Sequence, residues 1–261
     1  MPELPDVEGF KRYFVRHAAG HRIVTVEVLD RALVRNATAP ALERALDDRR
    51  FTRARRHGKW LIAETGGPCV LFHFGMTGLL AWSRSADERH PHDRVIFRLT
   101  DGELRYRNMR RFGGIWLARD AREREAVIGD LGPDALAVRR AEFHERIGGR
   151  RGAIKPVLMD QRLIAGLGNL LCDEVLWRAR LNPFNRVPSI DERARDAIYD
   201  RMNEVLRESN RHGRVPPKEG WLTGVRDDRS GRCPRCGARL RRAPLGGRTT
   251  CWCPRCQRRR R

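Results

Sequence analysis

The chain has 261 residues, of which 40% are hydrophobic and 33% charged, a size and balance that fit a folded protein with two modest domains. No apolar run approaches the roughly 18 residues of a membrane span, and early charges such as Glu3 and Lys11 argue against a signal peptide. We therefore expect a cytoplasmic protein with no membrane partner. The formal net charge of +21 favours a polyanionic partner such as DNA or RNA.

The N-terminus reads Met1-Pro2-Glu3-Leu4-Pro5. If Met1 is removed, Pro2 becomes a free secondary amine; an α-amino group titrates near about 7.7–8.0 and is partly unprotonated at neutral pH. Glu3 lies beside that amine as a candidate proton donor. Taken alone, the same motif more often marks a disordered start of a chain.

The first half of the chain is predicted to be rich in β-structure. Val7, Phe10 and Phe14 share one face of a helix that runs toward Gly20. Asp101-Gly102 favours a hairpin turn between two alternating segments. Strands are expected at 23–29, 59–64, 95–100, 103–107 and 113–118, and strand pieces broken at Gly75 and Gly78 are expected within 70–82. A short helix is expected at 41–48 and a domain boundary at 131–133.

The second half changes to a helical period, with helices expected at 142–147, 154–161, 170–178 and 191–209. Asn169 is a suitable N-cap for the third of these. The preceding segment Ala165-Gly166-Leu167-Gly168 joins two helices, and its backbone N–H groups suit a phosphate at a helix N-terminus. An ordinary turn between helices is the alternative.

Cysteine spacing indicates a metal centre near the C-terminus. Cys233-Pro-Arg-Cys236 and Cys253-Pro-Arg-Cys256 form two knuckles separated by 16 residues, which fits a four-thiolate zinc ribbon. Cys251 competes as a ligand, but only Cys253 repeats the geometry of the first knuckle. Cys69 and Cys172 lie in apolar contexts and are interpreted as core residues.

Nearly all the positively charged residues of the chain are arginines. The segment 226–261 holds 13 Arg against Asp227 and Asp228, whereas the whole chain has only four lysines. A lysine can lose its proton and an arginine cannot, so Lys59 and Lys155 are candidates for a functional amine.

These features together resemble one family, the bacterial formamidopyrimidine-DNA glycosylase and endonuclease VIII family. The resemblance runs from Pro2 to Cys256. The motifs that carry it are the N-terminal Pro2–Glu8, Arg55–Trp60, His73–Gly78, Arg110–Gly113, Ile154–Asp160, Gly166–Asn169 and the two cysteine knuckles.

The resemblance implies an α+β fold with an N-terminal antiparallel β-sandwich and flanking helices at 1–132. It implies a helical helix–two-turn–helix DNA-binding domain at 133–224, a zinc finger with one structural zinc ion at 225–257 and a basic tail at 258–261. The expected partner is double-stranded damaged DNA. The protein is expected to act as a monomer in the bacterial cytoplasm, associated with the nucleoid.

The resemblance also implies an activity, which is excision of a damaged base followed by cleavage of the strand at the abasic site. Pro2 is expected to be the nucleophile, Glu3 to protonate or polarise the sugar, and Lys59 to be the catalytic lysine on a β-hairpin. Flipping a base out of the duplex leaves a gap that intercalating side chains fill. The expected DNA-binding residues, the first three of them intercalating, are Met76, Arg110, Phe112, His73, His92, Arg150, Lys155, Asn169 and Arg248. For Met76 and Phe112 the alternative is core packing, and for Lys59 it is an exposed strand-edge lysine.

The chain departs from the family pattern at two places. The segment 210–232 is short where the formamidopyrimidine branch carries a long loop, and Arg226-Asp227 replaces the usual Tyr-Gly pair. Asn108-Met109 replaces the usual Asp-Pro before Arg110. These changes leave the base preference open among oxidised pyrimidines, ring-opened purines and bulkier adducts.

Two other functions fit part of the sequence. A non-catalytic zinc protein that binds damaged or abasic DNA would explain the charge and the cysteines, as would a ribosomal or RNA-binding protein. Neither explains the combination of Pro2, Glu3 and Lys59, which favours the enzyme.

Overall fold

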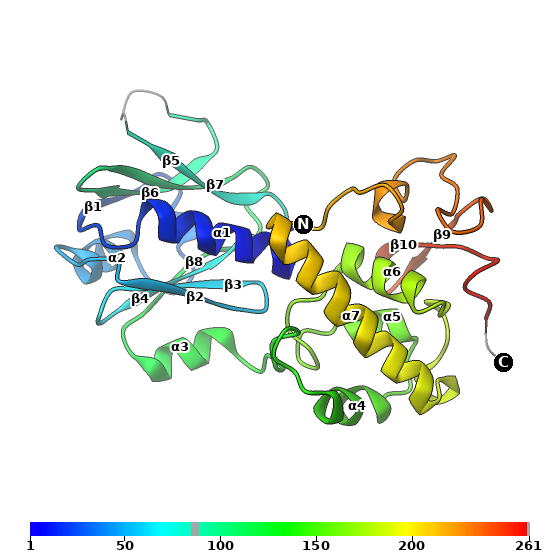
Figure 1. Cartoon of the computed structure of the whole chain (residues 1–261). Helices are drawn as coiled ribbons and strands as arrows, with labels where there is room; N and C mark the ends of the chain where they lie inside the picture. The colour runs from blue at the N-terminus through cyan, green and yellow to red at the C-terminus, as the bar shows by residue number, and fades with distance from the viewer. Residues whose placement is uncertain (85–88, 260–261) are drawn as a thin grey trace. The chain divides into compact units, whose positions relative to one another are not determined.

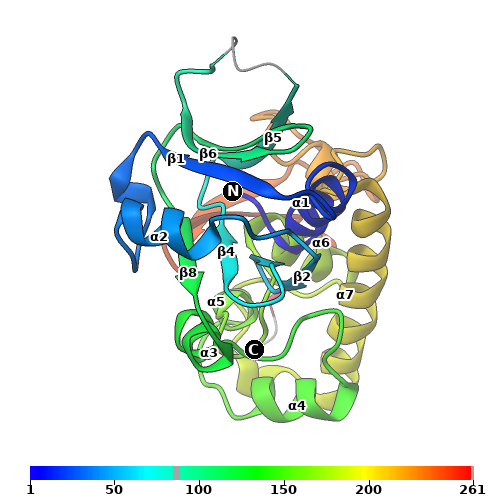
Figure 2. The ribbon, with the colours of Figure 1, turned by 90° about the vertical axis from the view of Figure 1, so that its left-hand side faces the viewer.

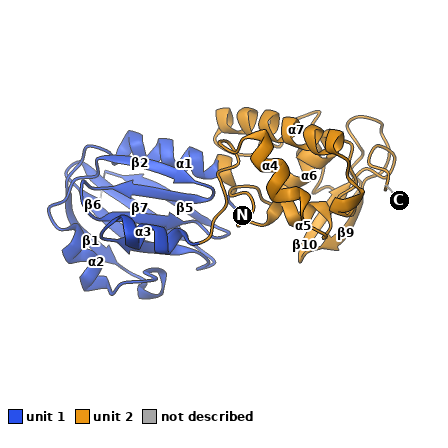
Figure 3. Cartoon of the chain, turned by 90° about the horizontal axis from the view of Figure 1, so that it is seen from below, with its two compact units in different colours: residues 1–2, 6–129 blue, residues 3–5, 130–261 orange. Residues whose placement is uncertain are grey.

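The computed structural model describes residues 1–84 and 89–259. The chain forms two compact units, coloured separately in Figure 3: Met1–Pro2 with Asp6–Gly129, and Glu3–Pro5 with Asp130–Arg261. The division after Gly129 lies close to the boundary expected at 131–133. The sequence did not indicate that Glu3–Pro5 would belong to the second unit.

Unit 1 contains two four-stranded antiparallel sheets, seen as two layers in Figures 1 and 2. The order of the first sheet is β1-β6-β7-β5, and that of the second is β2-β3-β4-β8. The bounds of the strands are β1 Ile23–Val28, β2 Arg53–His57, β3 Trp60–Glu64, β4 Cys69–His73, β5 Gly78–Ser83, β6 Asp93–Leu99, β7 Gly102–Asn108 and β8 Gly114–Ala118.

Aromatic side chains fill the space between the two sheets. The ring of Phe72 on β4 lies 5.8 Å from that of Phe97 and 6.0 Å from that of Tyr106, both on the other sheet. Helix α1 (Leu4–His17) adds Val7 and Phe14 to this core, as their shared face predicted. The sandwich expected for the first half of the chain is therefore present.

Shorter helices cover the flanks of the sandwich. Helix α2 (Ala39–Leu46), capped by the side chain of Thr38, packs against β1, and the turn η1 (Arg31–Leu33) precedes it. Helix α3 (Ala121–Ile128) covers the outer face of the second sheet through Val127 and Ile128. Strand β2 and helix α3 are not expected from the sequence.

Most of unit 2 is helical (Figure 1), and its helices pack on an apolar core. Its helices are α4 (Arg140–Gly148), α5 (Ile154–Met159), α6 (Asn169–Arg178) and α7 (Glu192–His212), with short turns η2 (Val187–Ser189) and η3 (Leu222–Gly224). Helix α7 begins after the cap Asp191 and ends at Gly213, whose φ of +63° suits glycine. Nearly every residue of α6 after its first turn is buried, so this helix forms the centre of the unit.

The C-terminal part of unit 2 is a hairpin of β9 (Arg241–Leu245) and β10 (Arg248–Trp252). Gly246 and Gly247 form its two-residue turn with φ of +57° and +71°, a geometry that favours two glycines. The last two residues of the predicted basic tail, 260 and 261, lie outside the described residues. Within the described parts of the chain, every helix is too short or too polar to cross a bilayer.

The structure confirms one local prediction and corrects another. The strand pieces expected within 70–82 form as β4 and β5, with the break between His73 and Gly78, and the two strands belong to different sheets. Asn169 is not an N-cap but the first residue of α6; Gly168 occupies the cap position and has no side chain to bond the helix amides.

Candidate active site and zinc centre

Glu3 fills the role that an N-cap side chain would have in α6. Its two carboxylate oxygens accept hydrogen bonds from the backbone N–H of Leu170 at 2.8 Å and of Leu171 at 3.1 Å. Its side chain is only 1% exposed. The partial positive charge at the N-terminus of the helix complements the carboxylate oxygens that accept these two bonds. These two N–H groups are consequently not available to a phosphate.

The turn before α6 is built around Glu3 and Leu4. A Cβ on Gly168 would overlap the Glu3 carboxylate, and a Cβ on Gly166 would overlap the Leu4 side chain. The backbone N–H of Leu4 donates to the Gly166 carbonyl at 3.1 Å. Gln161 holds the turn from the other side, since it accepts from Gly166 N–H and donates to the Leu167 carbonyl. The glycines therefore fix the residue that directly follows Pro2.

Lys59 lies in the two-residue turn between β2 and β3, on the hairpin that the family resemblance implies. Gly58 precedes it with φ of +54°, which favours glycine at the first position of such a turn.

The charge of Lys59 also affects the pKa of His73. Burial first, and then the Lys59 ammonium, lower the pKa of His73 to about 4, so this imidazole is neutral at pH 7. In that form its Nδ1 accepts from Gly75 N–H at 3.3 Å.

The predicted intercalating residues lie on two neighbouring loops of unit 1, which we call the wedge loops. The first is 74–77 and carries Met76; the second is 109–113 and carries Arg110 and Phe112. The Phe112 side chain is 52% exposed, and the Arg110 guanidinium lies 5.5 Å from the centre of its ring. Core packing is thereby excluded for Phe112. A Cβ on Gly75 would overlap the Phe112 carbonyl, so the two loops are in close backbone contact.

A fully buried amide joins the wedge loops. Asn108 Nδ2 donates to the Phe112 carbonyl at 2.6 Å and to the Tyr106 hydroxyl at 3.0 Å. Its Oδ1 accepts from Arg111 N–H at 3.0 Å and lies 3.2 Å from the Thr77 hydroxyl oxygen. That hydroxyl accepts from the backbone N–H of Arg110 at 3.0 Å. Asn108, which departs from the family pattern, therefore forms the hydrogen-bond network that shapes the second wedge loop.

His92 lies next to this network. Its carbonyl accepts from Asn108 N–H at 2.9 Å, and its Nδ1 is 3.3 Å from the Arg94 guanidinium. The structure therefore brings His92, His73 and the three wedge residues to one region of unit 1.

Unit 2 brings together Asn169 and the hairpin that carries Arg248. Asn169 Nδ2 donates to the carbonyl of Thr249 at 3.1 Å, and Arg248 is the exposed residue directly before Thr249. Arg150 is also exposed, in the loop after α4, where its Nε donates to the Arg146 carbonyl.

The structure contradicts a direct DNA contact by Lys155. This residue lies on α5, where its side chain is 0% exposed. Its Nζ is 2.6 Å from Asp173 Oδ1 and donates to Thr250 Oγ1 at 2.8 Å. An ammonium held this way cannot reach a phosphate at the surface, so Lys155 supports the hairpin instead.

Four thiol groups converge as the cysteine spacing predicts. The sulfur atoms of Cys233, Cys236, Cys253 and Cys256 all lie within 4.8 Å of one another. Zinc–sulfur bonds of about 2.3 Å in a tetrahedron place sulfur atoms about 3.8 Å apart, and the observed Cys233–Cys256 distance is 3.9 Å. The four residues therefore fit one structural zinc ion. Cys251 lies outside this cluster, where burial raises the pKa of its thiol to about 11.

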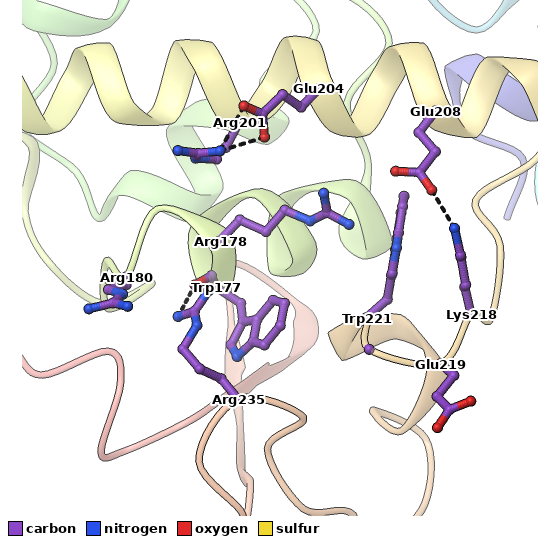
Figure 4. Close-up of a pocket in the computed structure, with 11 residues that line it drawn as sticks. Trp177, Arg178, Arg180, Arg201, Glu204, Glu208, Lys218, Glu219, Trp221 and Arg235 are labelled. Carbon is purple, nitrogen blue, oxygen red and sulfur yellow. Dashed lines mark hydrogen bonds and ion pairs between the residues drawn. The ribbon is translucent and has the colours of Figure 1, made fainter.

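Unit 2 also contains a cavity at the other end of α6, shown in Figure 4. It measures about 610 Å³ and is lined by residues at the C-terminal end of α6, among them Trp177 and Arg178. Arg178 is nine residues after Asn169, which corresponds to about 13 Å along the helix. Its guanidinium stacks on the Trp221 ring at 4.1 Å, and the Lys218–Glu208 pair closes one side. The cavity is therefore not part of the candidate active site.

Several residues that shape the site carry no local sequence signal. Asp173 and Arg226 act through contacts that are distant in the sequence, such as the 2.8 Å bond from Arg226 to Asp173. Gln161 bonds nearby residues, but in a turn that has no periodic pattern. The only available signal is the acidic pair Asp173-Glu174 inside an otherwise apolar helix, because buried charges in such a run require partners.

Family models match this chain over most of its length. Residues 1–115 match the formamidopyrimidine-DNA glycosylase N-terminal domain, 131–215 its H2TH domain, and 230–259 the zinc finger found in FPG and IleRS. Curated relatives include the formamidopyrimidine-DNA glycosylases of Pelotomaculum thermopropionicum, 33% identical over 98% of this chain and 99% of the relative, and Methylococcus capsulatus, 34% identical over 99% and 100%.

Solved structures agree with these matches. The Lactococcus lactis formamidopyrimidine-DNA glycosylase, bound non-covalently to DNA with an abasic site, has a TM-score of 0.92 and 28% identity over 99% of this chain and 100% of that one. The same enzyme with DNA containing N7-benzyl-Fapy-dG has a TM-score of 0.90 and 28% identity, with the same coverage. With its two sheets, its H2TH helices and its four-cysteine centre, this chain belongs to the formamidopyrimidine-DNA glycosylase family.

Proposed function

We propose that this chain is a base-excision-repair DNA glycosylase that also cleaves the strand at the resulting abasic site. The observation that carries the proposal is the position of Glu3, the residue directly after Pro2. Its buried carboxylate accepts hydrogen bonds from two backbone amides at the start of α6. The backbone of a disordered terminus would not be fixed in this way. The double-stranded DNA substrate is matched by the net charge of +21.

The chemistry begins once Met1 has been removed and the nitrogen of Pro2 is a secondary amine. Its lone pair forms a bond to the sugar C1′ while the bond from C1′ to the damaged base breaks, and the base leaves with that electron pair and takes up a proton. The nitrogen bonded to C1′ then loses its proton, the C1′–O4′ bond breaks and O4′ takes up a proton, which opens the sugar ring and leaves an iminium. Glu3 is the group that protonates or polarises the sugar. The covalent intermediate divides one difficult substitution into easier steps.

Strand cleavage follows from the same intermediate. The cationic nitrogen on C1′ acidifies the proton on C2′, and loss of that proton expels the 3′ phosphate by elimination. We propose that Lys59 is the catalytic lysine of this cleavage step. It lies in a tight turn whose first residue, Gly58, has the positive φ that favours glycine.

In this proposal the DNA is held by several of the exposed residues described above. Met76, Arg110 and Phe112 fill the gap that the flipped base leaves, because the exposed ring and the guanidinium beside it can stack on bases. His73 and His92 support the same region, and Arg150, Asn169 and Arg248 contact phosphates. The large positive charge opposes self-association, so we propose that the protein acts as a monomer, at the nucleoid in the bacterial cytoplasm.

For the lesion, we propose a site that is less selective for 8-oxoguanine than is usual in the family. Two residues of the short segment 210–232 could have covered a flipped base, but both are buried in other contacts. Trp221 is 4% exposed and packs in the core of unit 2, and Arg226 is 7% exposed and paired with Asp173. A site with fewer closing polar groups rejects other bases less strongly.

Single-turnover base release from matched duplexes tests both the activity and the lesion preference. We expect oxidised pyrimidines, ring-opened purines or bulky adducts to react at least as fast as 8-oxoguanine. A rate for 8-oxoguanine opposite cytosine more than about tenfold above every other lesion, or about 1.4 kcal/mol of barrier, would contradict the preference. Binding of these duplexes without release of any base would contradict the activity itself and favour a non-catalytic damage-binding protein.

A further inference from the structure

Unit 2 contains a buried charge cluster that the chemistry above does not use. Lys155, Asp173 and Arg226 are 0%, 1% and 7% exposed, and we call them the buried triad. Asp173 Oδ1 is 2.6 Å from Lys155 Nζ, and its Oδ2 accepts from the Arg226 guanidinium at 2.8 Å. Two cations thus share one carboxylate.

The buried triad holds the strand that follows Arg248. The Thr249 carbonyl accepts from the Arg226 guanidinium at 3.2 Å and lies 3.5 Å from Lys155 Nζ. Asp173 Oδ2 also accepts from the backbone N–H of Cys251 at 3.2 Å. The start of β10 is therefore fixed by charged side chains rather than only by its pairing with β9.

The same contacts connect β10 to the first turn of α6. The Thr249 carbonyl that Arg226 bonds is also the acceptor for Asn169 Nδ2. Asp173 lies four residues after Asn169 on that helix, which places the two side chains on one face. Arg226 thus reaches both elements that carry the proposed phosphate contacts, Asn169 and Arg248.

Arg226 also fixes the other strand of the hairpin. Its own carbonyl accepts from Nε of Arg242 on β9 at 2.9 Å, and its second guanidinium nitrogen donates to Asp227 at 2.9 Å. The usual tyrosine at this position could offer one hydroxyl bond, whereas a guanidinium offers a planar set of donors and a permanent charge. Arginine at position 226 can therefore bond more groups at once than the usual tyrosine can.

Stability alone does not explain such a cluster. Burial of ion pairs has a desolvation cost that often cancels their attraction, so an apolar replacement would serve the core as well. What charged groups add is a fixed geometry, because each donor and acceptor accepts only certain positions.

We propose that Arg226 is a positioning residue that sets Arg248 and Asn169 to bind one DNA phosphate. The inference rests on the proposed function, because it assigns that pair to the phosphate backbone. Arg226 itself does not contact DNA; it acts through the Thr249 carbonyl and Asp173.

A double-mutant cycle tests this role with a duplex that contains a tetrahydrofuran analogue of an abasic site. Arg226→Gln and Arg248→Ala are each expected to weaken binding about tenfold and to make the salt dependence shallower. If Arg226 acts through Arg248, the double variant is also about tenfold weaker, whereas independent effects would multiply to about 100-fold. Zinc content should stay at one ion per chain in all three proteins.

Arg229→Gln is the matched control, because it removes one exposed arginine from the same loop. It should change binding less than about threefold. If Arg226→Gln loses zinc, the cycle is repeated with Arg226→Lys, which keeps the charge beside Asp173, and the same non-additivity is required. Multiplying effects, or unchanged binding by Arg226→Gln, would overturn the inference. Failure of the unmodified protein to bind the abasic duplex would instead contradict the proposed function.

Discussion

At the scale of single residues, the position of Glu3 depends on a glycine. A side chain at Gly168 would overlap the Glu3 carboxylate, so Gly168→Ala should displace that carboxylate from the N–H groups of Leu170 and Leu171. We expect base release to slow at least about 100-fold, a barrier increase of roughly 2.7 kcal/mol. Single-turnover kinetics on a damaged duplex measure this effect.

Gly148→Ala is the control for that substitution. Gly148 is the last residue of α4, and a Cβ there would meet no atom within 4 Å. Its rate of base release should match that of the unmodified protein. A Gly168→Ala protein with an unchanged rate would show that base release does not depend on the hydrogen bonds between Glu3 and the start of α6.

His73 gives the stability of unit 1 a predictable pH dependence. Burial and the charge of Lys59 lower its pKa to about 4, against about 6.5 in an unfolded chain. The unfolded chain therefore binds a proton more tightly, so this contribution is complete above about pH 6.5 and is lost as the pH falls toward 4. Its size is at most about 3 kcal/mol.

Urea unfolding of unmodified protein and His73→Asn between pH 4 and 7 checks this prediction. Asparagine keeps an acceptor for Gly75 N–H but does not titrate. The stability difference between the two proteins should shrink as the pH falls. A difference that is constant across this range would mean that His73 is not held neutral by the fold.

At the scale of structural elements, the wedge loops depend on Asn108. Asn108→Ala removes two donated bonds and leaves the Phe112 carbonyl and Arg111 N–H without their partner. We expect a loss of about 2–4 kcal/mol in unfolding free energy and weaker binding to damaged duplex. Chemical denaturation and binding titration measure the two effects.

Asn36 offers a matched comparison in the same unit. Its amide bonds both the N–H and the carbonyl of Leu117 on β8. Asn36→Ala should lower stability by a similar amount but leave DNA binding of the folded protein unchanged. Equal loss of binding in both variants would assign the Asn108 effect to general destabilisation.

The zinc centre supports the β9–β10 hairpin directly. Structural zinc contributes to folding, and Cys233 also accepts a bond from the Trp177 indole N–H at 3.3 Å. Cys253→Ser should therefore lose both the metal and tight DNA binding, whereas Cys69→Ser, in unit 1, should keep one zinc per chain. Metal analysis of purified protein checks this. Full zinc in Cys253→Ser would contradict the ligand set.

At the scale of the whole molecule, elements with strong periodicity were predictable. The helix with Val7, Phe10 and Phe14 on one face forms as expected. The hairpin also forms, but its two-residue turn is Thr100-Asp101 rather than Asp101-Gly102, because Gly102 pairs with Leu99. Strand β2 was missed because its sequence Arg-Ala-Arg-Arg-His has no apolar alternation, and α3 because its large apolar residues, Val127 and Ile128, come only at its end. Their placement depends on the neighbouring sheet.

The site was predictable where residues act through local motifs. The four cysteines converge as their spacing indicates, and Lys59 lies on a hairpin turn. Lys155 was wrong as a direct DNA contact, because its partners Asp173 and Thr250 are distant in the sequence. Contacts between distant segments leave no periodic pattern, so only the fold reveals them.

The proposed attack of the Pro2 amine on the sugar is open to a direct experiment, which is borohydride trapping on a duplex with an abasic site. Protein whose intact mass shows that Met1 has been removed should form a covalent complex with this DNA on reduction. Pro2→Gly keeps an amine but loses the constrained secondary one, so its yield of complex should fall sharply. Undiminished trapping by Pro2→Gly would contradict the account and move the nucleophile to another amine, with Lys59 the first candidate.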